Sequence, residues 1–236
     1  MTGAGAASAP ASGGDTGGST DFLYPFLDAE ERDQDSLLGD LAASARAKSA
    51  ESAALRAQTL TECAEQVAAA GAELARRFVA GGRMFTFGNG GSSTDAATLA
   101  GLFARPPGAA GARPLPAWSL TADQAVLTAL GNDVGFELVF ARQLIARAGG
   151  RDVAVAMSTS GSSRDLTVAF AEARRRGLYT VGFAGYDGGE FAASPDVDVC
   201  FVVRSQSVHR IQEAQALLGY RLWAEVHSCL EGETQR

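Results

Sequence analysis

The sequence has very little lysine, cysteine and histidine, and each shortage excludes a kind of chemistry. Lys48 is the only lysine among 20 basic residues, so the chain has no Walker-type phosphate loop, which needs a lysine after its glycines. Lys48 alone is left for Schiff-base chemistry, and its polar surroundings are typical of a solvated helix face. Three widely spaced cysteines suit reduced packing thiols better than a disulfide framework. Neither histidine has convincing metal-ligand spacing, and we expect no metal or other cofactor.

Long apolar runs and an excess of positive charge are also lacking. No stretch approaches the roughly 18 uninterrupted apolar residues of a membrane span, and the first residues lack the basic and apolar regions of a signal peptide. We therefore expect a cytoplasmic protein without membrane contact. The formal net charge of −7 argues against direct nucleic-acid binding, because Lys and Arg must neutralise the phosphates there.

The organisation of the chain follows from changes in composition. At 236 residues and 46% apolar composition, the chain can bury one sizeable core. Residues 1–20 are almost entirely small or polar, too weakly apolar to offset the entropy of ordering, and we predict a disordered tail. Residues 21–236 are expected to form a single domain. Its N-terminal part, about residues 36–80, has helical apolar spacing and predicts one or two helices, broken near residues 49–52.

After residue 82, short apolar runs alternate with helical segments, which is the pattern of βα units and a parallel sheet. The predicted strands are residues 83–88, 115–120, 152–157, 179–184 and 197–203. A final helix is expected at about residues 208–230. Ligands of such open sheets bind beyond the carboxyl ends of the strands, so the loops that leave the strands are the candidate sites.

Two of these loops carry similar chemistry. The stretch "FGNGGSSTDAATLAG" places three glycines and Asn89 between a strand and a helix, and in "MSTSGSSRDL" five of the six residues 158–163 carry a hydroxyl. Glycines admit a ligand close to the backbone, and hydroxyls together with N–H groups at a helix start suit an anion. Serine and threonine are also ordinary N-caps, and "GNGG" is an ordinary turn. The recurrence in successive βα units favours a phosphate site.

Five segments resemble the sugar isomerase (SIS) domain family, and within it the phosphoheptose isomerases: "FGNGGSS", "LTADQAVLTALGNDVGFELVFARQL", "AMSTSGSSRDL", "GFAGYDGGEFA" and "HRIQEAQ". The resemblance covers about residues 36–230. It implies an α/β fold, a three-layer αβα sandwich with a five-stranded parallel sheet and a helical N-terminal extension. It also implies a homodimer or, more often, a homotetramer with binding sites at subunit interfaces.

The ligand implied by this resemblance is a sugar phosphate, sedoheptulose 7-phosphate or a similar ketose phosphate. The residues implied to hold the phosphate are Ser158, Thr159, Ser160 and Ser163. Those implied to line the sugar are Asn89, Ser92, Asp123 and Gln212.

The chain departs from the family at the catalytic positions. The isomerases move a proton between neighbouring carbons through an enediol, using a glutamate and a histidine, and some bind zinc. Where they place a histidine and then a glutamate after "GNGGS", this chain has Thr98 and Leu102. Where they place a histidine eight residues after the matching glutamine, it has Tyr220. The usual acid, base and metal ligands are therefore missing.

Other residues are candidates to replace them. His209, Gln212 and Glu213 are spaced i, i+3 and i+4, so one helical face presents all three near the expected sugar site. His209 is a candidate base, with Glu213 beside it and Tyr220 as a candidate proton donor. A histidine near a helix start is otherwise a capping or surface group, and His227 is expected to be structural.

An alternative function comes from another branch of the same family. A SIS protein that binds the bacterial replication initiator also lacks the catalytic set, and "SSRD", "GYDGGE" and "RIQE" resemble it. Under this alternative the protein is a non-catalytic sugar-phosphate sensor or an assembly scaffold with a protein partner. The aromatic segment "DFLYPFL" is then a candidate contact.

Overall fold

The structure, a computed structural model, describes residues 34–108 and 112–234. The predicted disordered tail and the "DFLYPFL" segment lie outside the described residues. The chain divides into two compact units, with the boundary between Ala47 and Lys48. The described part of the first unit is the beginning of helix α1 (Gln34–Glu62), in which Leu38 and Leu41 are exposed.

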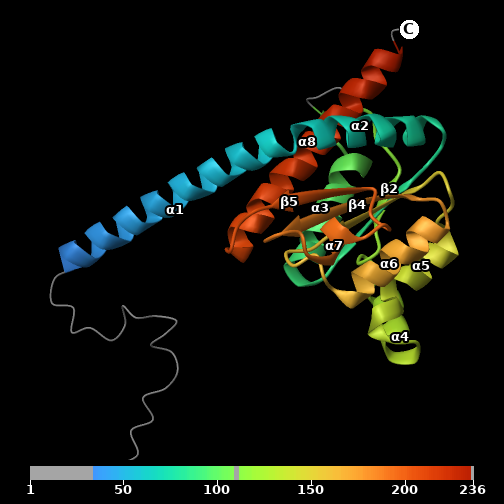
Figure 1. The fold of residues 1–236 in the computed structure, drawn as a ribbon, viewed down its shortest axis with the longest axis horizontal. Coiled ribbons are helices and arrows are strands. Elements are labelled where there is room, and N and C mark those ends of the chain that lie inside the picture. The colour runs from blue at the N-terminus through green and yellow to red at the C-terminus, as the bar shows by residue number, and fades with distance from the viewer. Residues whose placement is uncertain (1–33, 109–111, 235–236) are drawn as a thin grey trace, which may run out of the picture. The chain divides into compact units, whose positions relative to one another are not determined.

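The second unit is built on a five-stranded, all-parallel sheet with the order β2-β1-β3-β4-β5 (Figure 1). Each predicted strand is present. The strands are β1 (Met84–Gly88), β2 (Ala117–Ser119), β3 (Val153–Met157), β4 (Tyr179–Gly185) and β5 (Val199–Val203). The helices after α1 are α2 (Ala64–Val79), α3 (Gly90–Ala104), α4 (Gln124–Asp133), the 3₁₀ helix η2 (Phe136–Leu138), α5 (Val139–Arg147), α6 (Arg164–Arg175), α7 (Gly189–Ala193) and α8 (Val208–Thr234).

Helices cover both faces of the sheet, which confirms the three-layer αβα sandwich. Helices α2, α3 and α8 pack with one face around a core that includes Leu74, Phe103 and Phe201 (Figure 1). Helices α5 and α6 cover the other face, where the rings of Phe87 and Phe170 lie 5.8 Å apart. Because both faces are covered, every residue of β1 and β3 is buried, which explains their uninterrupted apolar sequences.

The predicted helix break near residues 49–52 is wrong. Helix α1 runs without interruption to Glu62. The interruption between the two helices falls at Cys63, the residue before α2. Serine competes with helical backbone hydrogen bonds when its hydroxyl turns to the local backbone. Here the hydroxyl of Ser52 instead donates to the carboxylate of Glu213 on α8, so it is engaged away from its own helix.

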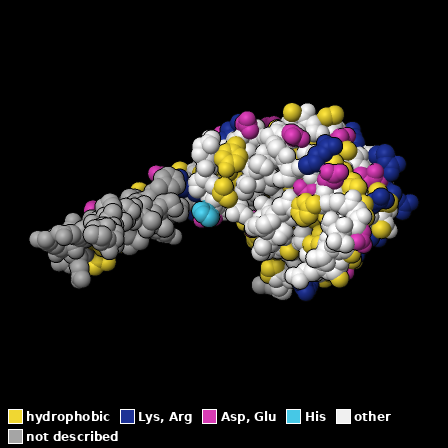
Figure 2. Space-filling view, turned by 90° about the horizontal axis from the view of Figure 1, so that it is seen from below, with side chains coloured by type: hydrophobic (Ala, Val, Ile, Leu, Met, Phe, Trp, Pro, Cys, Tyr) yellow, Lys and Arg dark blue, Asp and Glu magenta, His cyan; other side chains and the backbone are white. Residues whose placement is uncertain are grey.

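The surface of the described residues shows no segregation of charge on the face seen in Figure 2, where basic and acidic side chains are interspersed and hydrophobic ones are scattered in small groups. None of the helices in the described residues combines the length and the hydropathy that crossing a membrane requires.

Candidate functional site

The strand order changes direction once, between β1 and β3. The chain leaves β1 toward β2 on one side, and β3 continues toward β4 on the other side. In open α/β sheets with this order, ligands bind between the two neighbouring strands where the direction changes. Gly88 and Met157, the last residues of β1 and β3, are paired in register. Residues 89–93, which comprise Asn89 and the first turn of α3 and are called the glycine loop below, therefore leave the sheet beside residues 158–163, the hydroxyl loop.

The hydroxyl loop is held in shape by three of its residues. The N–H of Gly161 donates to the hydroxyl of Ser158 over 3.0 Å, and the N–H of Glu190 donates to the hydroxyl of Ser162 over 3.1 Å. Gly161 has a φ of 66°, and a Cβ at this position would lie 2.3 Å from the carbonyl oxygen of Gly188. Only glycine fits here without strain.

Two hydroxyls of this loop, those of Thr159 and Ser163, are not engaged by other described residues. Ser163 precedes α6 as its N-cap residue, but its side chain makes no capping hydrogen bond. Thr159 and Ser163 are half-buried, with no hydrogen bond from the hydroxyl of either residue to another described residue. Ser160 is exposed, and its hydroxyl accepts from the N–H of Ser162 over 3.3 Å and lies 3.4 Å from the hydroxyl of Ser158. The ordinary capping role of serine therefore does not account for Ser163. A helix N-terminus with free N–H groups and uncommitted hydroxyls favours an anion.

The glycine loop is tied to the hydroxyl loop through Asn89. Its side-chain Nδ2 lies 3.0 and 2.9 Å from the two carboxylate oxygens of Asp165 in the first turn of α6. Asp165 is 4% exposed and forms no ion pair with any described residue. Burial raises the pKa of the Asp165 carboxyl, and the hydrogen bond from Asn89 opposes this rise. One buried carboxylate thus joins the two loops.

The first turns of α8 reach the same edge of the sheet. Gln212 donates from its Nε2 to the carboxylate of Asp95 on α3 over 3.1 Å. The same Nε2 would lie 2.6 Å from a Cβ at Gly91, so the absence of a side chain there lets Gln212 approach the glycine loop. Gln215 is fully buried and donates from Nε2 to the carbonyl oxygen of Ser158 over 2.8 Å. Burial also raises the pKa of the Asp95 carboxyl.

The structure places two other predicted sugar-binding residues, Ser92 and Asp123, at the starts of helices. Ser92 is 6% exposed in the first turn of α3. Asp123 is the N-cap residue of α4, and its carboxylate accepts from the N–H of Val126 over 3.1 Å. This bond accounts for an aspartate at position 123 whether or not a ligand is bound.

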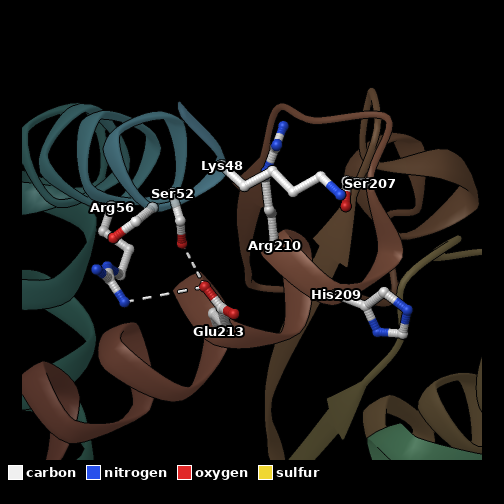
Figure 3. Close-up of a pocket in the computed structure, with 8 residues that line it drawn as sticks. Lys48, Ser52, Arg56, Ser207, His209, Arg210 and Glu213 are labelled. Atoms are coloured by element: carbon white, nitrogen blue, oxygen red, sulfur yellow. Dashed lines mark hydrogen bonds and ion pairs between the residues drawn. The ribbon is translucent and has the colours of Figure 1, made fainter. Parts of the chain in front are cut away.

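Two of the three predicted catalytic residues of α8, His209 and Glu213, lie beside α1. His209 and Glu213 line a pocket of about 580 Å³ (Figure 3). The residues that line it are Lys48, Ser49, Ser52, Arg56, Ser207, His209, Arg210 and Glu213. The carboxylate of Glu213 is engaged by the hydroxyl of Ser52 and by Arg56 at 3.9 Å. Gln212 contacts Asp95 on α3, so the neighbouring residues Gln212 and Glu213 of α8 contact different helices.

The positions where the family's metal ligands are expected do not fit a zinc site. Thr98 donates its hydroxyl to the carbonyl oxygen of Thr94, and Leu102 packs against the apolar core. Tyr220 is 49% exposed, with its ring 5.4 Å from that of Trp223. Zinc in proteins is bound by Cys, His, Asp or Glu, and within the described ranges no three such side chains gather.

His227 is structural, as expected. It is 7% exposed, and its two ring nitrogens lie 3.1 Å from the carbonyl oxygens of Trp223 and Arg113. It therefore connects α8 with the segment before β2.

Asp95, Asp165 and Gln215 are the residues of this edge to which the sequence assigned no role. Asp95 and Asp165 lie within the segments "FGNGGSSTDAATLAG" and "MSTSGSSRDL", so their positions in the sequence could have indicated that they belong to the site. For Gln215, the only indication in the sequence was its spacing, three residues after Gln212 on the same helix.

Comparison with known proteins agrees with this architecture. Residues 49–185 match the SIS domain family. The chain is 43% identical to a phosphoheptose isomerase of Solidesulfovibrio magneticus over 178 residues, which are 73% of this chain and 82% of that protein. It is 38% identical to a phosphoheptose isomerase of Aquifex aeolicus over 73% of this chain and 88% of that protein. The structure of the phosphoheptose isomerase of Neisseria gonorrhoeae superimposes with a TM-score of 0.71 at 32% identity, covering 80% of this chain and 99% of that one. The chain belongs to the SIS domain family, in which it resembles the phosphoheptose isomerases.

Proposed function

We propose that this protein binds a sugar phosphate in the crevice between β1 and β3, with the phosphate on the hydroxyl loop and the sugar between the glycine loop and Gln212. The observation that carries the proposal is the pairing of Gly88 with Met157, which brings the two loops together at the edge where such sheets bind ligands. Membership of the SIS domain family and the similarity to phosphoheptose isomerases support the choice of ligand.

The hydroxyl loop can bind a phosphate through neutral hydrogen-bond donors, without a lysine. Ser160 and Ser163, together with the first N–H groups of α6, offer neutral donors to an anion. Each hydrogen bond to a charged group contributes about 1.5 to 3 kcal/mol, so three or four of them hold a phosphate without a cation. We choose sedoheptulose 7-phosphate as the first ligand to test, from the names of the relatives.

For the reaction, we propose an aldose–ketose isomerisation with His209 as the base. A base must take a proton from one carbon of the sugar and return it to the neighbouring carbon through an enediol. Gln212 lies one helical turn from His209, and we propose that a sugar held by Gln212 reaches the imidazole. Glu213 is engaged by Ser52 and Arg56, whereas the imidazole of His209 makes no hydrogen bond to another described residue. No step in this proposal passes through a metal.

We also propose that the protein acts as a homo-oligomer, a dimer or a tetramer, in the cytoplasm. The similarity to the phosphoheptose isomerases supports this expectation. Analytical ultracentrifugation over a range of concentrations gives the mass of the particle. A monomer at all concentrations contradicts the proposal.

The phosphate site is tested by removing the hydroxyls of Ser160 and Ser163. Ser160→Ala combined with Ser163→Ala should lower the affinity for sedoheptulose 7-phosphate by at least about 100-fold, because two hydrogen bonds to a charged group are lost. Isothermal titration calorimetry measures the affinity. Ser162→Ala is the matched control, since the hydroxyl of Ser162 already accepts from the N–H of Glu190 and should contribute little to binding. Equal affinity in the double variant and the wild type contradicts the assignment of the phosphate.

The reaction is tested by a proton and phosphorus NMR time course with sedoheptulose 7-phosphate, without metal and then with zinc. We expect new heptose phosphate signals in the wild type and none with His209→Ala, which should still bind the sugar phosphate. Binding without product in the wild type contradicts the isomerase and supports the alternative of a sensor or scaffold. A variant that keeps the full rate contradicts the role of His209.

A further inference from the structure

The buried carboxylate of Asp165 has a feature that a structural role does not require. A helix start can be capped by the residue that precedes it, and Ser163 stands in that place, but its hydroxyl is not used. The N–H of Leu166 donates to the carbonyl oxygen of Ser163 over 3.0 Å. The side-chain partner of the Asp165 carboxylate is the amide of Asn89, which lies 76 residues earlier in the chain.

An ionised carboxylate only accepts hydrogen bonds, and a carboxamide has a donor end and an acceptor end. The Nδ2 of Asn89 must therefore face Asp165, because the opposite orientation would place oxygen against oxygen in a buried site. Nδ2 lies at nearly equal distances, 3.0 and 2.9 Å, from both carboxylate oxygens. The Oδ1 of Asn89 consequently points away from Asp165.

We propose that Asp165 is a positioning residue that fixes the side chain of Asn89 with its carbonyl oxygen toward the ligand, so that Asn89 accepts a hydrogen bond from a sugar hydroxyl. This inference rests on the proposed function. It assigns selectivity for the sugar part of the ligand to the pair Asn89 and Asp165, and it leaves the phosphate to the hydroxyls of Ser160 and Ser163. A phosphate, which offers acceptors, gains nothing from the Oδ1 of Asn89.

The conservative change Asp165→Asn separates this role from a structural one. It keeps the size of the side chain and an oxygen that accepts hydrogen bonds, but an amide at position 165 pairs with Asn89 in either orientation. The loss of a negative charge near the phosphate strengthens the binding of any phosphate. The measured quantity is therefore the ratio of two affinities, for sedoheptulose 7-phosphate and for inorganic phosphate, because the change of charge affects both ligands alike.

We expect Asp165→Asn to lower this ratio by about 2- to 10-fold, the effect of one neutral hydrogen bond. Asn89→Ala should lower it by a similar factor, and the double variant should lower it no further than Asn89→Ala alone. Asp187→Asn is the matched control: it removes the same charge from an exposed loop after β4, where the carboxylate accepts only from the N–H of Gly189. A ratio in Asp165→Asn equal to that of the wild type overturns the inference.

A second measurement does not depend on the ligand. In the wild type, the side-chain amide protons of Asn89 should exchange slowly with water, because Nδ2 is held by a buried carboxylate, and NMR of ¹⁵N-labelled protein records this exchange. Rapid exchange overturns the inference. If the wild type binds neither ligand, the proposed function fails, whereas slow exchange that is lost in Asp165→Leu still establishes that Asp165 holds Asn89.

Discussion

At the scale of single residues, Asp165 should affect stability in a way that depends on pH. Burial raises the pKa of its carboxyl above the ordinary value of 3.8, so the folded protein holds this proton more tightly than the unfolded chain does. The contribution of this group to stability is therefore fully present below pH 3.8 and is lost as the pH rises through the folded-state pKa.

The free energy of unfolding of the wild type, taken relative to that of Asp165→Asn, should consequently fall between pH 3.8 and neutrality. Urea unfolding of both proteins at a series of pH values measures the difference, in which the other titrating groups cancel. If the free energy of unfolding of the wild type relative to Asp165→Asn instead rises with pH, the fold stabilises the ionised carboxyl. That result contradicts the raised pKa expected from burial.

At the scale of elements, the turn between β3 and α6 depends on Gly161. Its φ of 66° costs about 1 to 2 kcal/mol for a residue with a Cβ, and the contact with the carbonyl oxygen of Gly188 adds to this cost. We expect Gly161→Ala to lower the free energy of unfolding by at least about 2 kcal/mol and to weaken phosphate binding. Urea unfolding and calorimetry measure the two effects.

The control for this element is Gly232→Ala in α8, where a Cβ would meet nothing within 4 Å. Alanine is the better helix former, so stability there should stay the same or rise by up to about 1 kcal/mol. If both alanine variants behave alike, the shape of the hydroxyl loop does not depend on Gly161.

At the scale of the whole molecule, a ligand that binds only the folded state raises the melting temperature. A ligand at 100 times its dissociation constant stabilises the folded state by about 2.7 kcal/mol. For a protein of this size we expect a rise of about 5 to 10 °C with sedoheptulose 7-phosphate. Differential scanning fluorimetry at one fixed protein concentration measures it, and the rise should vanish in Ser160→Ala, Ser163→Ala. A rise that persists in this variant places the ligand elsewhere.

The sequence was sufficient for the sheet and for the two loops because both depend on local patterns. Runs such as "DVAVAM" must be buried on both sides, and a glycine-rich turn after such a run marks the carboxyl edge of a parallel sheet. The continuity of α1 through Ser52 was missed, because the partner of Ser52 is 161 residues away on α8.

The same limit applies to the site. The bonds from Gln212 to Asp95 and from Gln215 to Ser158 join residues 117 and 57 positions apart. No local pattern fixes which side of α8 faces which strand. The separation of Gln212 from Glu213 into different surroundings depends on how α8 packs, and only the folded chain shows it.

The single lysine lines the same pocket as His209. Amine-directed reagents therefore have a single side-chain target in this sequence, Lys48. A fluorophore or cross-linker placed on Lys48 can thus be introduced without engineering a cysteine. The sequence already carries a chemical handle in the lining of this pocket.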